Sequence, residues 1–154
     1  MSAFEEAIIQ RIKQLEREVE RLQKWERPIG GGLTPVFLTT PKTSTSWDGD
    51  ARSDTSPTKI DLSAVFGVPA GVKAVIIRLL CRDSAAWGTK DLYLSVGPSS
   101  TLFSQVVARP AGGDVFIENS GICNCDANGD IYYGINASGT NTMDCWIEIY
   151  GWWL

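Results

Sequence analysis

The first 27 residues carry a repeating pattern of hydrophobic and polar positions that predicts a helix. No Gly or Pro occurs between Phe4 and Trp25, and most residues there favour helices. The hydrophobic residues follow at intervals of four, three, four and three, the a/d alternation of a heptad: Ile8, Ile12, Leu15, Val19 and Leu22. This narrow stripe favours a coiled coil over a single amphipathic helix packed on its own domain, because such a helix presents a wider hydrophobic face.

The residues beside this seam bear on how many helices associate. Placing Ile12 and Val19 at a, with Leu at d, favours two strands. The hexapeptide from Arg11 to Glu16 instead resembles the Arg-h-x-x-h-Glu signature of short trimeric coiled coils. In that signature the Arg reaches a Glu of a neighbouring helix, and its alkyl stem covers the core. We predict a homotrimer, with a dimer as the alternative. Because helices this short are marginal alone, the rest of the chain must add contacts.

The pattern changes completely after the helix. Pro28 and the three glycines that follow predict a hinge at 28–33 after a coiled coil at 1–27. Short hydrophobic runs separated by Gly, Pro, Asn and Ser then recur at about ten-residue spacing, which predicts an all-β sandwich or jelly-roll-like domain at 34–154. The most hydrophobic run, 72–82, is expected to be a central strand. The other expected strands are 34–40, 91–96, 103–109, 114–117, 130–135 and 145–152, and a polar loop containing Trp47 is expected at 43–58.

The composition removes several function classes. The net charge of −4 gives no general attraction for nucleic acid or for an anionic membrane. No apolar run approaches the roughly 18 residues that cross a bilayer, and the acidic N-terminus does not resemble a signal peptide. The sequence contains no His, which excludes Ser-His and Cys-His nucleophiles and the commonest zinc ligand. We therefore predict no nucleic-acid partner, no membrane insertion and no enzymatic activity.

Two groups of residues superficially suggest metal sites. The four cysteines, Cys81, Cys123, Cys125 and Cys145, form one Cys-x-Cys and two isolated positions, whereas zinc modules pair Cys-x2-Cys knuckles. We expect buried free thiols, with a disulfide or a metal site as alternatives. The segment Asp126–Asp130 resembles the start of a calcium loop, but position 137 is Ala where such loops need Glu. Its Asn-Gly pair favours a hairpin turn, so no metal and no cofactor are expected.

Carboxylates and aromatic residues are the remaining candidates for chemistry. Paired carboxylates hydrolyse glycosides without His, but no spacing selects a pair from Asp83, Asp91, Asp114, Glu118 and Asp144. A Trp or Tyr on a loop can stack on a sugar ring or anchor a protein. We predict that Trp47, Trp87 and Tyr133 face the surface and bind a ligand, whereas Trp146 is expected to be buried or at a subunit contact.

Three segments of the β region resemble β domains of phage structural proteins: Ile60–Val75, Arg78–Ser84 and Ile147–Leu154. With the helical leader and the glycine hinge, the chain looks like a phage fibre, tail-tip or head-fibre protein. The resemblance implies a homotrimeric virion component, assembled in the host cytoplasm, whose helical end meets other virion proteins and whose β end meets the host surface. A 22-residue helix spans only about 33 Å, so a short spike or head fibre is as plausible as a tail fibre.

Two functions follow from this resemblance. The first is a receptor-binding module for a host cell-surface glycan. The second is a capsid decoration or cementing protein that binds only other virion proteins. An exposed aromatic groove favours the first function, and a large apolar patch without a groove favours the second.

Overall fold

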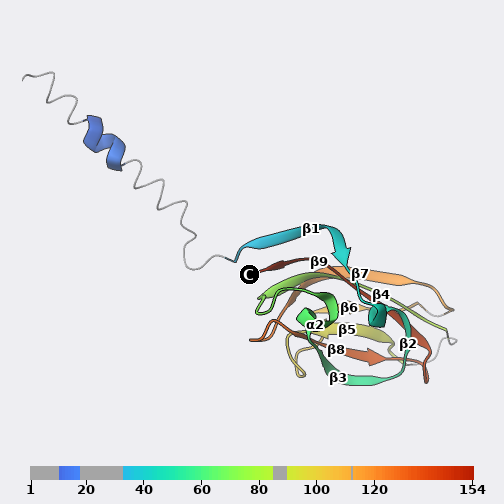
Figure 1. The fold of residues 1–154 in the computed structure, drawn as a ribbon. Coiled ribbons are helices and arrows are strands. Elements are labelled where there is room, and N and C mark those ends of the chain that lie inside the picture. The colour runs from blue at the N-terminus through green and yellow to red at the C-terminus, as the bar shows by residue number, and fades with distance from the viewer. Residues whose placement is uncertain (1–10, 18–32, 85–89, 112) are drawn as a thin grey trace, which may run out of the picture. The chain divides into compact units, whose positions relative to one another are not determined.

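The computed structural model of the chain describes residues 11–17, 33–84, 90–111 and 113–154, and it divides into two compact units, Met1–Gly32 and Leu33–Leu154. In the first unit, residues 11–17 form a helix (Figure 1). Ile12 and Leu15, three residues apart on one face of it, are each 50% exposed. The other seam residues, Ile8, Val19 and Leu22, lie outside the described residues, so the coiled coil stays a prediction. Among the described residues, no helix is long and apolar enough to cross a membrane.

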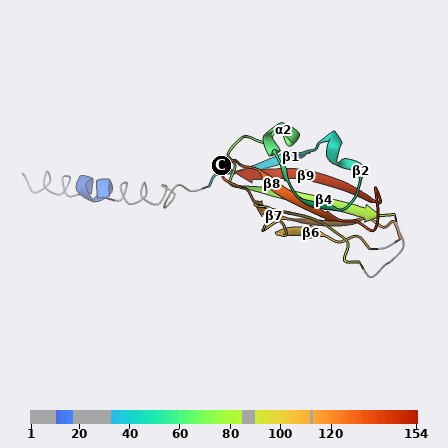
Figure 2. The same ribbon diagram turned by 90° about the horizontal axis from the view of Figure 1, so that it is seen from below.

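The second unit confirms the predicted mostly-β class, because its described residues form two antiparallel sheets in two layers (Figures 1 and 2). The large sheet has the order β1-β9-β4-β7, with β2 also paired to β9. Its strands are β1 (Pro35–Lys42), β2 (Asp48–Arg52), β4 (Ala74–Asp83), β7 (Ile117–Asn124) and β9 (Met143–Trp153). The small sheet has the order β3-β8-β5-β6. Its strands are β3 (Thr55–Ile60), β5 (Tyr93–Gly97), β6 (Val106–Ala108) and β8 (Ile131–Asn136).

The hydrophobic core lies between the two sheets. Strand β4 pairs with both β9 and β7, which confirms that the most hydrophobic run is central. Every second residue of β4 points inward and is fully buried: Val75, Ile77, Leu79 and Cys81. The small sheet opposes them with the inward residues Leu94, Val96, Ile131 and Ile135. This alternation also fixes which residues of each sheet face outward.

A short helix, α2 (Leu62–Phe66), covers one end of the core. The Asp61 carboxylate accepts a hydrogen bond from the Ala64 backbone N–H at 2.9 Å, which caps the helix at its N-terminus. Gly67 ends the helix with a φ of 62°, in the left-handed region that suits glycine. Leu62 and Phe66 are buried in the core, and the Leu62 backbone N–H donates a hydrogen bond to the Asp130 carboxylate, just before β8, at 3.2 Å.

The sequence prediction was wrong in two segments. The expected loop at 43–58 instead contains the 3-10 turn η1 (Thr45–Trp47), all of β2 and most of β3. The expected strand at 114–117 begins three residues later, and β7 runs from Ile117 to Asn124 along residues 74–81 of β4. These strands have few buried residues, so they lack the hydrophobic pattern on which the prediction depended.

Candidate functional site

The structure corrects the prediction that Trp47 faces the surface, because its side chain is only 4% exposed. The η1 turn directs the ring into the core, where it contacts the edge of Tyr133 with ring centroids 4.7 Å apart. The guanidinium of Arg52 lies over the same ring, 4.1 Å from its centroid. Tyr133 is itself half-buried and packs against the core. Trp47 and Tyr133 therefore contribute to core packing. The third predicted residue, Trp87, lies outside the described residues.

Trp146 is half-buried on the outward face of the large sheet, so it is not a core residue, and the alternative expectation of a subunit contact stays a prediction. Its ring contacts Phe116, with ring centroids 5.0 Å apart. Phe116 is 49% exposed and belongs to the segment that precedes β7. The chain's own residues thus cover Trp146.

All four cysteines are free thiols, and three of them are buried: Cys81, Cys123 and Cys145. Cys81 and Cys145 are register partners on β4 and β9. Burial in hydrophobic surroundings raises the pKa of Cys81 and that of Cys123 to about 12, because the thiolate loses its hydration. These side chains act in the core as small hydrophobic residues.

We predict that the buried thiols resist modification in the folded protein. With Ellman's reagent at about pH 8, where an exposed thiol near its ordinary pKa reacts readily, Cys81, Cys123 and Cys145 should react only as the domain unfolds. In denaturant all four thiols should react at once. Cys125 is partly exposed, so a Cys125→Ser variant removes any slow native signal. Rapid native reaction of two or more thiols would contradict this packing.

The segment Asp126–Asp130 forms a tight turn, as its Asn-Gly pair predicts, but not a hairpin, because it leads from β7 of the large sheet to β8 of the small sheet. The Asp126 carboxylate accepts hydrogen bonds from the backbone N–H groups of Asn128 and Asp130 at 2.8 and 2.9 Å. The ammonium of Lys59 pairs with Asp130 at 2.6 Å and lies 3.7 Å from Asp126. Burial acts to raise the pKa of Asp126, but these hydrogen bonds and the nearby Lys59 lower it below its usual range. The carboxylates of this turn therefore stabilise the fold.

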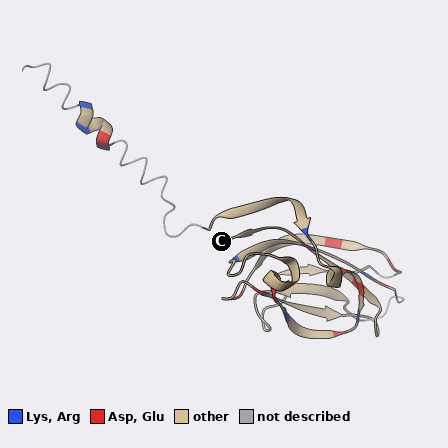
Figure 3. Ribbon diagram, viewed as in Figure 1, with Lys and Arg blue, Asp and Glu red and all other residues tan. Residues whose placement is uncertain are grey.

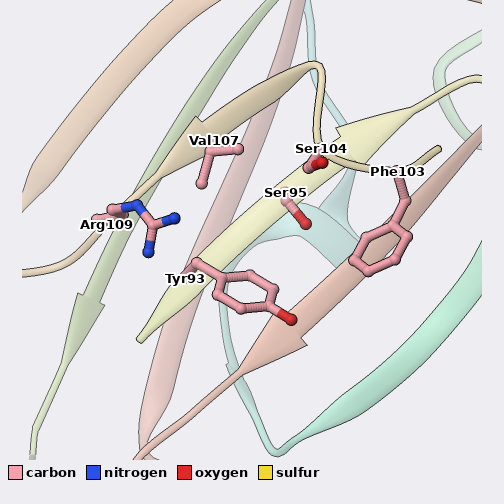
Figure 4. Close-up of a pocket in the computed structure, with 6 residues that line it drawn as sticks. All are labelled: Tyr93, Ser95, Phe103, Ser104, Val107 and Arg109. Carbon is pink, nitrogen blue, oxygen red and sulfur yellow. The ribbon is translucent and has the colours of Figure 1, made fainter. Parts of the chain in front are cut away.

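A small pocket opens on the outward face of the small sheet (Figure 4). Strand β5 contributes Tyr93 and Ser95, whose neighbours Leu94 and Val96 point into the core. Side chains alternate along a strand, so Tyr93 and Ser95 face outward. Val107 faces outward from β6 by the same alternation. The connection between β5 and β6 adds Phe103 and Ser104, and Arg109 follows β6.

The floor of the pocket is formed by one small residue, Ser95. Ser95 is 1% exposed, and its hydroxyl donates a hydrogen bond to the carbonyl of Gly134 at 3.3 Å. Gly134 is the register partner of Ser95 on β8. A Cβ added at Gly134 would lie 2.7 Å from the Phe103 ring, so this ring rests directly on the glycine. Tyr93 and Phe103 therefore stand on either side of a low floor (Figure 4).

The connection that carries Phe103 is held close to the end of β5. The Gln105 N–H donates a hydrogen bond to the Val96 carbonyl at 2.9 Å, and the Leu102 N–H bonds to Ser99 Oγ at 3.0 Å. A Cβ added at Gly97 would lie 2.6 Å from the Cα of Phe103. Only a glycine permits this backbone approach, so the position of Phe103 depends on Gly97.

Arg109 adds positive charge at the edge of the pocket. Its guanidinium lies 5.9 Å from the centroid of the Tyr93 ring and pairs with the carboxylate of Asp91. Both side chains of this ion pair are more than half exposed, at 56% and 69%, so the pair is weak. A guanidinium has five N–H donors, and one ion pair leaves others to bind a ligand oxygen.

The pocket has a volume of about 190 Å³. Sites that enclose drug-sized ligands typically have about 300–1,000 Å³, so this pocket suits a single ring-sized group. Its two aromatic rings can stack on the face of such a group, while the hydroxyls and the guanidinium bind polar substituents. Among the described residues, no cluster of three or more Cys, Asp or Glu side chains could hold a metal ion.

Sequence reasoning missed the three most useful residues of this pocket: Tyr93, Phe103 and Arg109. The signal for Tyr93 was present, since Tyr93 and Ser95 alternate with the hydrophobic Leu94 and Val96. An aromatic residue on the polar face of a strand is a candidate for an exposed contact. Phe103 and Arg109 offered no such signal, because their approach to Tyr93 depends on the pairing of β5 with β6 and β8.

No family model and no curated protein matches the sequence.

Proposed function

We propose that this chain is a non-enzymatic adhesion protein whose β domain binds a saccharide of a cell surface. The observation that carries the proposal is the outward-facing pocket in which Tyr93 and Phe103 flank a floor formed by Ser95, beside Arg109. The C–H face of a sugar ring stacks on aromatic side chains, and its hydroxyls need polar partners at the rim. The sequence, which has no His, offers no familiar nucleophile and base to hydrolyse what binds there.

The setting that we propose is a short homotrimeric fibre or spike of a phage particle, in agreement with the sequence resemblance described above. The helix would join three copies and attach them to other virion proteins. A pocket this small would hold one sugar weakly, with a dissociation constant of about millimolar. Three linked pockets that bind at once would gain avidity by a factor of 10² or more, which is enough for a particle to adhere.

The pocket can be tested with the full chain on a glycan array. Tyr93→Ala and Phe103→Ala should each lower binding to the recognised glycan by about 10- to 100-fold, since a central aromatic contact is worth roughly 1.4–2.8 kcal/mol. Tyr132→Ala is the matched control, because Tyr132 lies on the outward face of β8 but does not line the pocket. Its binding should stay within twofold of the unmodified chain.

Two results would contradict the proposal. One is an array on which the folded chain binds no glycan at any practical concentration. The other is a glycan that binds equally well after both pocket substitutions. The second candidate function, a decoration protein that binds only virion proteins, would then gain support from the exposed apolar residues of the large sheet, including Phe37 and Ile122.

A further inference from the structure

An apolar row crosses the outward face of the large sheet at the end where β1 begins. Phe37 of β1 is the register partner of Gly151 on β9, Gly151 pairs with Ile76 of β4, and Ile76 pairs with Ile122 of β7. Phe37 is 70% exposed and Ile122 is 59% exposed. Ile76 leans over the glycine, since its Cδ1 lies 3.3 Å from where a Gly151 Cβ would be. The apolar row is thus continuous across four strands.

Toward the end of the sheet where β1 begins, the apolar row is also flanked by uncharged residues. Leu33, two residues before β1, is 50% exposed, and Pro35 lies beside the partly exposed Trp153. Strands β1 and β7 are almost free of charged residues (Figure 3); each has a single one, Lys42 and Glu118. A partner for this surface therefore has to be apolar.

The rest of the same face is well partnered within the chain. In its middle, Arg78 forms ion pairs with Glu118 and with Glu148, the latter at 3.2 Å. At the far end Phe116 covers Trp146, and the Arg82 guanidinium lies 4.6 Å from the centroid of the Phe116 ring. Large apolar side chains exposed side by side are uncommon on a monomer's surface unless they meet another molecule. Within the part of the chain that the structure describes, the apolar row is therefore the region of this face that the chain's own residues leave most exposed.

We propose that the apolar row packs against a second copy of this chain. The proposal rests on the oligomer of the proposed function. Ile12 and Leu15 form an exposed hydrophobic pair on helix 11–17 and need a partner of their own. The predicted hinge, 28–33, has six residues and can span at most about 22 Å, so association of the helices would hold the rows of neighbouring copies within reach.

The size of the apolar row fits a supporting contact. A stable interface buries about 800 Å² on each partner, whereas Phe37, Ile76 and Ile122 supply only a few hundred, at roughly 150–250 Å² for a fully buried aromatic side chain. The row alone would be too small to hold two free copies together. Association of the helices would raise the local concentration of the β domains. Contact through the apolar row would then add affinity to the predicted coiled coil, which is too short to be stable by itself.

This arrangement leaves the saccharide pocket free. The apolar row lies on the outward face of the large sheet, and the pocket lies on the outward face of the small sheet. The hydrophobic core separates these two faces. Copies joined through the apolar row would therefore each present Tyr93 and Phe103 to the outside.

The test is a dilution series of the full chain in the analytical ultracentrifuge, with a Phe37→Ser/Ile122→Ser double variant beside the unmodified protein. The unmodified chain should be an oligomer, and the double variant should dissociate at a concentration at least tenfold higher. Phe116→Ser is the matched control on the same face and should dissociate like the unmodified chain. Circular dichroism and thiol protection of each variant verify that its β domain is folded.

Three outcomes separate the possibilities. A folded double variant that dissociates at the same concentration as the unmodified chain would overturn the proposal. An unmodified chain that is monomeric at every concentration would also overturn it, and would point to another protein or to the chain's own helix as the cover. Saccharide binding per site, measured on the same samples, reports on the pocket alone, so its failure is distinguishable from failure of the interface.

Discussion

Replacing Trp47 with Ala is expected to lower the free energy of unfolding of the β domain by about 3–5 kcal/mol, the usual cost of removing a buried aromatic side chain. The ring is 4% exposed and contacts both Tyr133 on β8 and Arg52 on β2. Without it, a cavity opens between η1 and the small sheet. The melting temperature should fall on the order of 10–20 °C.

A large loss of stability is expected if Trp47 packs in the core, but not if it is a surface residue that binds a ligand. Thermal and urea unfolding of Trp47→Ala measure the loss of stability, and Phe116→Ala serves as the control. Phe116 is 49% exposed, so its removal should cost only about 1 kcal/mol. A Trp47→Ala protein that is as stable as the unmodified chain but loses adhesion would show that the ring serves recognition and not packing.

Replacing Gly97 with Ala should abolish ligand binding at the pocket. A Cβ at this position would lie 2.6 Å from the Cα of Phe103 and close to the backbone of Leu102, and neither group can move alone. The β5–β6 connection would have to leave the end of β5, taking Phe103 with it. Binding should fall more than tenfold, and overpacking of this kind costs about 1–3 kcal/mol of stability.

Gly134→Ala is the informative companion to Gly97→Ala. Its new methyl group would meet the Phe103 ring, 2.7 Å away, and a side chain can rotate out of the way. We therefore expect weaker saccharide binding from Gly134→Ala with little change in stability. A Gly97→Ala protein that is as stable as the unmodified chain and binds the saccharide equally well would contradict the geometry of the β5–β6 connection.

The strands of the core were predictable from the sequence because they alternate or are continuously hydrophobic. The run from Ala74 to Cys81 and the segment before Trp152 both became central strands, β4 and β9. Strands β2 and β3 were not predictable, since Asp48–Arg52 has no hydrophobic period and forms a strand only by pairing with β9. Tertiary contacts decide such segments, and local propensity does not.

The pocket was harder to predict than the fold. Trp47 stood in a polar stretch, which suggested an exposed ring, yet one 3-10 turn was enough to bury it. Tyr93 stood in an expected strand and was not singled out, although its alternation with the hydrophobic Leu94 and Val96 places it on the outward face. A one-residue change of register exchanges the two faces of a strand. The polarity of the surrounding segment is therefore a poor guide to whether an aromatic residue is exposed. Its alternation with the inward-facing residues of a strand is a better guide.

We propose that the outward pocket of the small sheet binds a saccharide, and this binding can be observed directly. The most direct measurement is a titration of the isotopically labelled full chain with a panel of hexoses, N-acetylhexosamines and uronic acids, followed by NMR amide shifts at sugar concentrations up to tens of millimolar, the range where weak single sites fill. We predict that at least one sugar causes saturable amide shifts, and that the largest shifts occur at the residues that line the pocket: Tyr93, Ser95, Phe103, Val107 and Arg109. Saturable shifts confined to residues elsewhere, or no shifts with any sugar, would contradict it.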